Sequence, residues 1–280
     1  MPDFSDTSIS PDAPIGVFDS GIGGLSILKH IRAILPHEDL LYFADSSFAP
    51  YGGRPEEEIV ARSLAIAAFL VEHRAKALVV ACNTATAAAI KALRARYPSL
   101  PVVGVEPGLK PAAALTRSRT VGVLATKRTL SSEKFRLLHQ QIGAAADVRF
   151  LPQPCIGLAD QVEKGELQSA ATAELLHGYI APLIVQGADT LVLGCTHYPF
   201  VQPLIEKIIA RIASAPVAIV DTGEPVARQL KRLLSERNLE RIEGTGTISG
   251  FTTGGESALE DAFSRLLGIH PEVMRVAAGN

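Results

Sequence analysis

The stretch Leu191-Val-Leu-Gly-Cys-Thr-His-Tyr-Pro199 decides how the rest of this sequence is interpreted. An apolar run ends abruptly at Cys195, Thr196 and His197, and Pro199 then opens a helical stretch. Proline is favoured in the first turn of a helix, so the pattern predicts a buried strand followed directly by a helix. Reactive side chains are therefore expected at the carboxyl end of this strand, beside a helix N-terminus.

A second stretch, Leu78-Val-Val-Ala-Cys-Asn-Thr-Ala-Thr86, has the same order of residue types, with Cys82 just past the apolar run. The simplest interpretation of a single cysteine is a small buried hydrophobic side chain, which we adopt for Cys155. Cys82 and Cys195 differ because each lies where a strand gives way to a helix, a position that favours the thiolate. Two cysteines at equivalent points of two similar units predict a site with one thiol on each side.

Composition limits the classes of protein that this chain can belong to. Its 280 residues allow one large or two ordinary domains, and a hydrophobic share of 47% allows a sizeable core. A net charge of -2 with a pI of about 6.4 gives no sign of a bulk electrostatic partner such as nucleic acid or an anionic membrane. The three cysteines lack framework spacing, which favours reduced thiols in a cytosolic enzyme over a disulfide scaffold.

Neither the N-terminal segment nor any apolar run indicates a membrane or secretory destination. Residues 1–13 are polar and rich in Ser, Asp and Pro, without the basic and apolar regions of a signal peptide. We expect them to form a disordered tail. No apolar run approaches the roughly 18 residues that span a bilayer, so we expect a soluble, cytoplasmic protein.

Strand and helix patterns alternate along the whole chain, which is typical of parallel βαβ units. Apolar runs predict strands at residues 14–18, 39–44, 77–81, 101–105, 120–125, 147–151, 189–194, 216–220 and 246–251. Both halves share the order strand, cysteine, helix, which indicates two related domains. The expected fold class is α/β, with two similar parallel-sheet domains. In open parallel sheets the ligand crevice lies beyond the carboxyl ends of the strands.

Two further loops follow predicted strands and carry polar residues. Asp19-Ser-Gly-Ile-Gly-Gly24 forms a strand-to-helix turn, but it is not a dinucleotide fingerprint, because an acid in the turn would repel a pyrophosphate. Asp19 suits a substrate ammonium or a neighbouring proton-transfer group better. The loop 45–54 contains Pro50-Tyr51-Gly52, which could line the mouth of a site with backbone amides and a phenol.

Three chemistries fit these residues. Cys195 with His197 would suit acyl transfer, as in a Cys–His hydrolase. Cys82, Cys195 and His197 together could bind zinc. Two thiols on opposite faces of one carbon would suit the inversion of a stereocentre, in which one thiolate removes a Cα proton and the other thiol returns a proton from the far side.

The chain resembles the glutamate racemases, a family of the cofactor-independent aspartate/glutamate racemase superfamily, from about residue 15 to residue 251. The late segment 251–255 matches that family only loosely. The motifs that carry the resemblance are Gly16-Val-Phe-Asp19-Ser20-Gly21-Ile-Gly-Gly-Leu25, Pro50-Tyr51-Gly52, Ala81-Cys82-Asn83-Thr84-Ala85, Leu124-Ala125-Thr126 and Leu193-Gly194-Cys195-Thr196-His197-Tyr198-Pro199.

The resemblance implies interconversion of L- and D-glutamate for peptidoglycan synthesis, without pyridoxal phosphate or a metal. It implies that Cys82 acts as the base on D-glutamate and Cys195 as the base on L-glutamate. Asp19 would assist Cys82, and His197 would assist Cys195. The implied substrate contacts are Asp19, Ser20, Tyr51, Gly52, Asn83, Thr84, Thr126, Thr196 and His197, with Thr129 and Glu163 beside them.

The resemblance also implies partners and a domain arrangement, in which the two α/β domains face each other across an active-site cleft. The first domain is expected to be discontinuous, with residues 14–106 and 216–280, and the second to span residues 107–215. A homodimer is expected, and activation by a peptidoglycan precursor is known within the family. The alternatives at this stage are an aspartate or other amino-acid racemase of the same fold, a Cys–His hydrolase and a metal-binding module.

Overall fold

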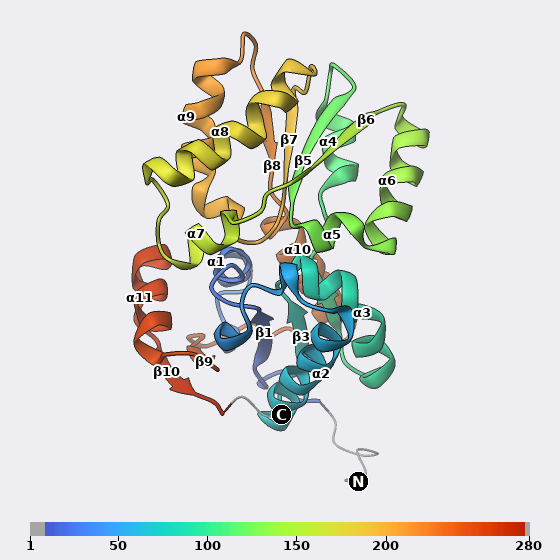
Figure 1. The fold of residues 1–280 in the computed structure, drawn as a ribbon. Helices are drawn as coiled ribbons and strands as arrows, with labels where there is room; N and C mark the ends of the chain where they lie inside the picture. The colour runs from blue at the N-terminus through green and yellow to red at the C-terminus, as the bar shows by residue number, and fades with distance from the viewer. Residues whose placement is uncertain (1–8, 278–280) are drawn as a thin grey trace.

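The computed structural model describes residues 9–277 and contains two α/β domains, one above the other in Figure 1. Of the predicted tail at residues 1–13, residues 1–8 lie outside the described residues. Residues 9–13 form a turn that packs on the first domain, where Ile9 contacts the core and Lys76 donates a hydrogen bond to the carbonyl of Pro11.

The first domain is built on a six-stranded sheet of order β10-β9-β2-β1-β3-β4, in which every pair is parallel. The central strand β1 is buried along its whole length, as parallel strands covered on both faces are. The strands are β1 (Ile15–Asp19), β2 (Leu40–Ala44), β3 (Ala77–Val80), β4 (Val102–Gly104), β9 (Ile248–Thr252) and β10 (Glu272–Arg275). The helices are α1 (Leu25–Ile34), α2 (Glu56–Glu72), α3 (Asn83–Arg96), α10 (Gly223–Glu236) and α11 (Glu256–Leu267), with short turns η1 (Ser46–Phe48) and η2 (Tyr51–Gly53).

The second domain has a four-stranded parallel sheet of order β6-β5-β7-β8. Its strands are β5 (Thr120–Ala125), β6 (Arg149–Pro154), β7 (Thr190–Gly194) and β8 (Ala218–Val220). Its helices are α4 (Leu109–Leu115), α5 (Lys127–Ser131), α6 (Glu133–Ala146), α7 (Leu158–Glu163), α8 (Ala170–Val185) and α9 (Gln202–Ile212), with the short turn η3 (Tyr198–Val201). The predicted class, two parallel-sheet α/β domains, is confirmed.

The chain returns to the first domain later than the sequence suggested. Strand β8 pairs with β7 in the second sheet, from Thr190 opposite Ala218 to Val192 opposite Val220. Helix α10, which follows, packs on α1 of the first domain. The expected return at residue 216 is therefore too early, because the last strand before α10 completes the second sheet. We propose residues 14–106 with 221–277 and residues 107–220 as the two domains.

The carboxyl ends of the central strands of both sheets carry the candidate residues. Asp19 ends β1, and Cys82 follows its neighbour β3; Thr126 follows β5, and Cys195 follows its neighbour β7. Hydrogen bonds cross between the domains at these ends, for example from the Ser26 hydroxyl to the carbonyl of Thr196 at 2.8 Å. The topology thus places one cluster from each domain at a shared interface.

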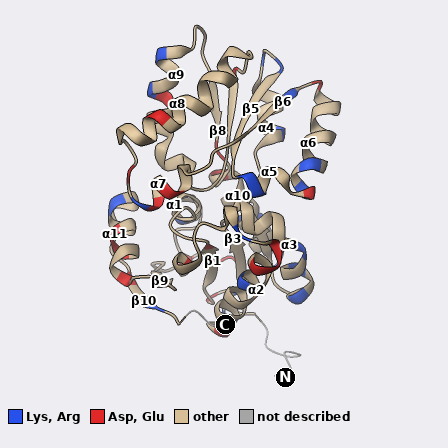
Figure 2. Cartoon of the chain, in the orientation of Figure 1, with Lys and Arg blue, Asp and Glu red and all other residues tan. Residues whose placement is uncertain are grey.

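Within residues 9–277, no helix is both long and apolar enough to cross a membrane. Charged segments of both signs are interspersed over the helices of both domains in Figure 2. This distribution agrees with the small net charge of -2.

A buried ion pair joins two loops at the amino ends of the first sheet. The Lys76 ammonium lies 2.5 Å from the Glu38 carboxylate, and neither side chain has any exposed surface. Glu38 also accepts a hydrogen bond from the backbone N–H of Arg241 at 2.9 Å. Burial lowers the pKa of Lys76, while the contact with Glu38 opposes that shift. The pair therefore ties the loops before β2 and β3 to the chain after α10.

Replacing Lys76 with Met should lower the free energy of unfolding by about 3–5 kcal/mol, because it leaves the Glu38 carboxylate buried without its charge partner. The double variant Glu38→Leu with Lys76→Met should recover most of that loss, since apolar side chains of similar size can replace a buried pair. Urea denaturation followed by circular dichroism measures both. Equal losses in the single and double variants would contradict this account.

Candidate active site

The first-domain half of the site is built around Cys82. Cys82 is the N-cap residue of α3, and its sulfur accepts a hydrogen bond from the N–H of Ala85 at 3.5 Å. The Ser20 hydroxyl lies 3.9 Å from the same sulfur. Only 5% of Cys82 is exposed. The sequence pattern of apolar strand followed by helix therefore places the thiol at the N-terminus of α3, where it accepts one of the unpaired helix N–H groups.

Asp19 lies beside Cys82 and is completely buried. Its Oδ2 atom accepts hydrogen bonds from the N–H groups of Gly21 at 3.3 Å and Gly24 at 2.9 Å. The glycine-rich turn thus wraps the carboxylate with backbone donors. The carboxylate of Asp19 therefore occupies the position at the start of α1 that favours an anion.

Burial governs the ionisation of both groups. It raises the pKa of Asp19, against the opposing charge of His197. It also raises the pKa of the Cys82 thiol well above its ordinary range, and the Asp19 charge adds to that shift, while the N–H of Ala85 opposes it. Cys82 therefore rests as a thiol, and a nearby positive charge would be needed to favour its thiolate.

The second-domain half is a hydrogen-bonded chain of three side chains. The Cys195 sulfur lies 3.6 Å from Nδ1 of His197, and Nε2 of His197 lies 2.6 Å from Oε1 of Glu163. The same Glu163 oxygen accepts the N–H of Ile22, in the first domain, at 3.0 Å. Cys195 and His197 are 6% and 3% exposed. Glu163 at the end of α7 therefore holds the imidazole from one domain while bonding the other.

The charge state of this chain follows from its contacts. Burial lowers the pKa of His197, but its hydrogen bonds to Cys195 and Glu163 outweigh burial and raise that pKa well above 6.5. Burial raises the pKa of Glu163, and the hydrogen bond to His197 reverses this, so the Glu163 pKa is lowered. An imidazolium–carboxylate pair is thus favoured next to the Cys195 sulfur.

The two halves are in direct contact because Gly21 and Gly23 have no side chains at the points of closest approach. A Cβ atom on Gly23 would lie 2.3 Å from Nδ1 of His197, and one on Gly21 would lie 2.0 Å from Oε1 of Glu163. The groups also share one electrostatic field, since His197 lowers the pKa of Asp19 and Cys195 raises that of Cys82. The geometry therefore brings the predicted set Asp19, Cys82, Cys195 and His197 together.

Three threonines link the domains beside the thiols. The Thr84 hydroxyl of α3 lies 3.1 Å from that of Thr126 and 3.3 Å from that of Thr129, and the last two are 3.0 Å apart. Thr126 also caps α5 by accepting the N–H of Thr129. These three hydroxyls form a polar cluster to which both domains contribute.

The remaining predicted contacts take different positions. A Cβ atom on Gly52 would lie 3.3 Å from Thr126, so this glycine also faces the second domain. The Tyr51 hydroxyl donates a hydrogen bond to Asp45 at 2.5 Å. Asn83 donates to the carbonyl of Val105 at 3.4 Å, and its buried Oδ1 has no hydrogen-bond partner among residues 9–277. That oxygen is available as an acceptor.

Sequence analysis did not identify two residues that shape this interface. Ser26, in the first turn of α1, donates to the carbonyl of Thr196. Asp45, just after β2, accepts a hydrogen bond from the Tyr51 hydroxyl. Asp45 could have been found, because it follows a strand that lies directly beside β1. Ser26 gave no signal, since its partner is a backbone atom of the other domain.

A metal site does not form among the described residues. Within residues 9–277, no group of three or more His, Cys, Asp or Glu side chains is arranged to hold an ion. Cys155 is also buried and donates a weak hydrogen bond to the carbonyl of Gln153 at 3.5 Å. Its interpretation as a structural cysteine stays a prediction.

Fold and site define an enzyme with two α/β domains and a buried thiol from each, and comparison with known proteins gives the family. The chain belongs to the Asp/Glu/hydantoin racemase family, whose sequence profile matches residues 15–230.

Individual relatives resemble the chain over almost its full length. A glutamate racemase of Ectopseudomonas mendocina is 50% identical over 261 residues, which cover 93% of this chain and 97% of the relative. Among solved structures, a glutamate racemase of Bacillus anthracis is 33% identical, with a TM-score of 0.85 and coverage of 95% and 98%. An Escherichia coli glutamate racemase, solved with L-glutamate and the activator UDP-MurNAc-Ala, is 30% identical, with a TM-score of 0.80 and coverage of 95% and 99%.

Replacing Gly23 with Ala should displace the His197 imidazole, because the added methyl would lie 2.3 Å from Nδ1. The pKa of His197 should then fall, since its bonds to Cys195 and Glu163 raise it. Titration of the ¹⁵N-labelled imidazole by NMR measures this change. Gly178→Ala on α8, where a Cβ atom meets nothing within 4 Å, is the matched control. A His197 titration that is the same in both variants would contradict the described packing.

Proposed function

We propose that this chain is a glutamate racemase, in which Cys82 and Cys195 deprotonate and reprotonate the Cα atom of glutamate from opposite sides. The observation that carries the proposal is the pair of buried thiols at equivalent strand ends of the two domains, each with its own acid-base partner. Relatives at about 50% identity that carry this name support the choice of glutamate.

In the direction from D- to L-glutamate, Cys82 is the base. Its thiolate takes the Cα proton and becomes a thiol, while the Cys195 thiol gives its proton to the other face and becomes a thiolate. The His197 imidazolium, 3.6 Å from the Cys195 sulfur, stabilises that new negative charge. In the reverse direction the two thiols exchange roles. Proton exchange with Asp19 and His197 then restores the starting state.

Substrate charge activates the first thiol in this scheme. Burial keeps Cys82 protonated and raises the pKa of Asp19 in the empty site. The substrate ammonium, placed near Asp19, would favour the charged forms of both groups. Hydroxyl, amide and backbone groups would hold the two carboxylates and fix Cα between the sulfurs. These proposed contacts are Ser20, Tyr51, Gly52, Asn83, Thr84, Thr126 and Thr196, with Thr129 and Glu163 behind them.

Cellular role and assembly extend the proposal. The enzyme supplies D-glutamate for peptidoglycan, the general role of this family, and we place it in the cytoplasm as a homodimer. Activation by a peptidoglycan precursor is tested by adding UDP-MurNAc-Ala, the activator printed for the Escherichia coli structure. No pyridoxal phosphate or metal enters the proposed reaction.

Loss of the Cα–H signal from D- and L-glutamate in D2O, followed by proton NMR without added cofactor, tests the proposal. Wild type should exchange and racemise both enantiomers. Cys82→Ser and Cys195→Ser should each reduce racemisation by at least about 10³-fold, because a serine hydroxyl is far less acidic than a thiol.

Two other functions predict different outcomes. If Cys82→Ser kept full activity on an ester or amide while Cys195→Ser lost it, a Cys–His hydrolase would replace the racemase. If aspartate lost its Cα–H while glutamate kept it, the fold and thiols would stand and the substrate would be wrong. Absence of exchange in every amino acid would overturn the proposal.

Replacing Glu163 with Gln should move the alkaline limb of the kcat/KM profile for D-glutamate to lower pH. The carboxylate raises the pKa of His197, so its loss lowers that pKa and the imidazolium disappears at a lower pH. Rate measurements from pH 6 to 10 test this, because that range extends about three pH units above the ordinary pKa of histidine. An unchanged alkaline limb in a folded variant would contradict the role given to Glu163.

A further inference from the structure

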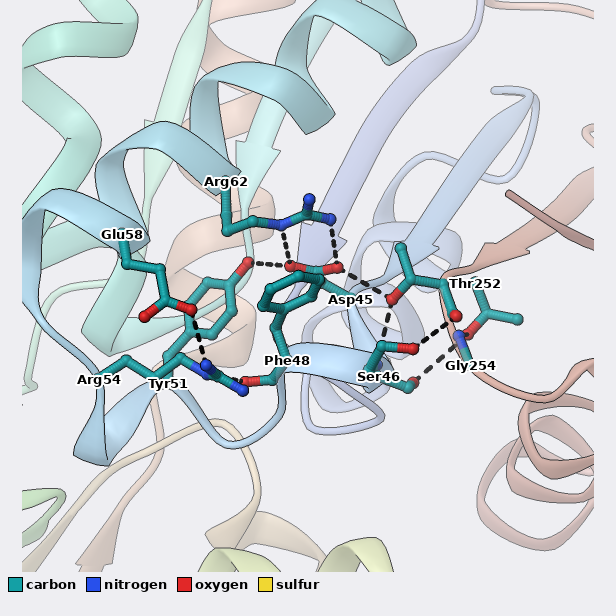
Figure 3. Close-up of polar contacts among 11 residues, drawn as sticks. Asp45, Ser46, Phe48, Tyr51, Arg54, Glu58, Arg62, Thr252 and Gly254 are labelled. Carbon is teal, nitrogen blue, oxygen red and sulfur yellow. Dashed lines mark hydrogen bonds and ion pairs between the residues drawn. The ribbon is translucent and has the colours of Figure 1, made fainter. Parts of the chain in front are cut away.

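A buried carboxylate organises the base of the loop 46–54. Asp45 has no exposed surface, and its oxygens accept hydrogen bonds from the Tyr51 hydroxyl at 2.5 Å, from Nε and Nη2 of Arg62 at 3.0 and 2.7 Å, and from the Thr253 hydroxyl at 2.9 Å (Figure 3). The donors come from the loop itself, from α2 and from the chain after β9. Asp45 therefore fixes the loop to the rigid part of the first domain.

Arg62 makes a second kind of contact with the same loop. Its guanidinium carbon lies 4.0 Å from the centre of the Phe48 ring, which is a cation–π distance. Arg54 closes the loop on itself by donating to the carbonyl of Phe48 at 2.5 Å and to Glu58 of α2 at 2.6 Å (Figure 3). The loop thus has a defined conformation although it has no regular strand.

The far side of this loop touches the second domain. Nη2 of Arg128, on α5, donates to the carbonyl of Arg54 at 2.6 Å. Close by, a Cβ atom on Gly52 would lie 3.3 Å from Thr126, one of the proposed substrate contacts. Arg128 is half-buried, whereas its neighbour Lys127 is exposed. One arginine from each domain therefore restrains the same loop.

We propose that Arg62 and Arg128 are positioning residues of the racemase reaction, which hold the loop 46–54 from opposite domains so that Tyr51 and Gly52 close over bound glutamate. The proposal rests on the proposed function. Neither arginine touches the reacting atoms. Each acts through the loop, Arg62 by way of Asp45 and Arg128 by way of the Arg54 carbonyl.

The burial of the thiols explains why loop position matters. Cys82 and Cys195 are 5% and 6% exposed, so a doubly carboxylated substrate reaches them only when contacts between the domains open. Closing must then rebuild a site in which Cα lies between the two sulfurs, and misplacement by about 1 Å is costly in such a site. A loop that is already shaped and then clamped by Arg128 reduces the ordering that closure requires.

Arg128→Met tests the clamp without removing any buried charge pair, and Lys127→Met is its matched control. Arg128→Met should raise KM for both enantiomers roughly three- to tenfold, the range expected for a partly exposed hydrogen bond from a charged donor. Its kcat should change by less than about twofold, because the thiols and their partners are intact. Arg128→Lys should recover part of the loss, since an ammonium can still donate to the Arg54 carbonyl. Lys127→Met should match wild type.

Arg62→Lys tests the base of the loop, since it keeps the positive charge beside Asp45 but loses the paired geometry. It should raise KM in the same direction in a protein whose far-UV circular dichroism is unchanged at 25 °C. If Arg62→Lys does not fold, the Arg128 series decides alone. Unchanged KM in Arg128→Met overturns the proposal. Cα–H exchange by wild type tests the racemase function separately, so failure of one is distinguished from failure of the other.

Discussion

The carboxyl ends of two parallel sheets point at each other, and every feature of the site depends on that constraint. Buried parallel strands use their backbone groups within the sheet, so polar side chains are concentrated where the strands end. Asp19 and Cys82 stand at neighbouring ends of the first sheet, and Thr126 and Cys195 at neighbouring ends of the second. Because the two sheets face each other, each domain places a thiol and its partner at the shared interface without a long loop. The glycines of the turn 21–24 let the two clusters come into contact.

Although the two thiols occupy equivalent positions, their surroundings differ in charge. Cys82 lies beside a buried carboxyl whose pKa is raised by burial, so that side is poised to gain from a positive substrate group. Cys195 lies beside an imidazole whose pKa is raised by Cys195 and Glu163 once the opposing effect of burial is overcome. In this account Cys82 needs a positive group from the substrate, whereas Cys195 already has the His197 imidazolium beside it. In the proposed inversion at Cα, the two thiols would therefore be activated in different ways.

Much of this arrangement could be predicted from local patterns, because strand ends and helix starts are local. The expected strand before Cys195 matches β7 closely, and Cys195 lies beside His197 at the end of that strand. Long-range pairings could not be predicted: β8 completes the second sheet, and β6 runs on through Pro152 and Pro154 because an edge strand tolerates proline. Strand β10 was not predicted. The contacts of Asp45 with Arg62 and Thr253 and those of Glu38 with Lys76 and Arg241 were also not predicted. These partners lie 17 residues or more away in sequence and are fixed only by packing.

The central claim is that two separate thiols serve one carbon, and isotope placement during the first turnovers tests it most directly. Unlabelled L-glutamate is incubated with the enzyme in D2O and stopped at less than about a tenth of equilibrium conversion, when each molecule has turned over at most once. Because Cys82 would return a solvent-derived deuteron while Cys195 removes the proton, D-glutamate should carry deuterium at Cα and the remaining L-glutamate should keep protium. The reverse experiment should give the mirror result. Protium retained in the product, or deuterium appearing equally in both enantiomers from the start, would mean that one base serves both faces and would contradict the account.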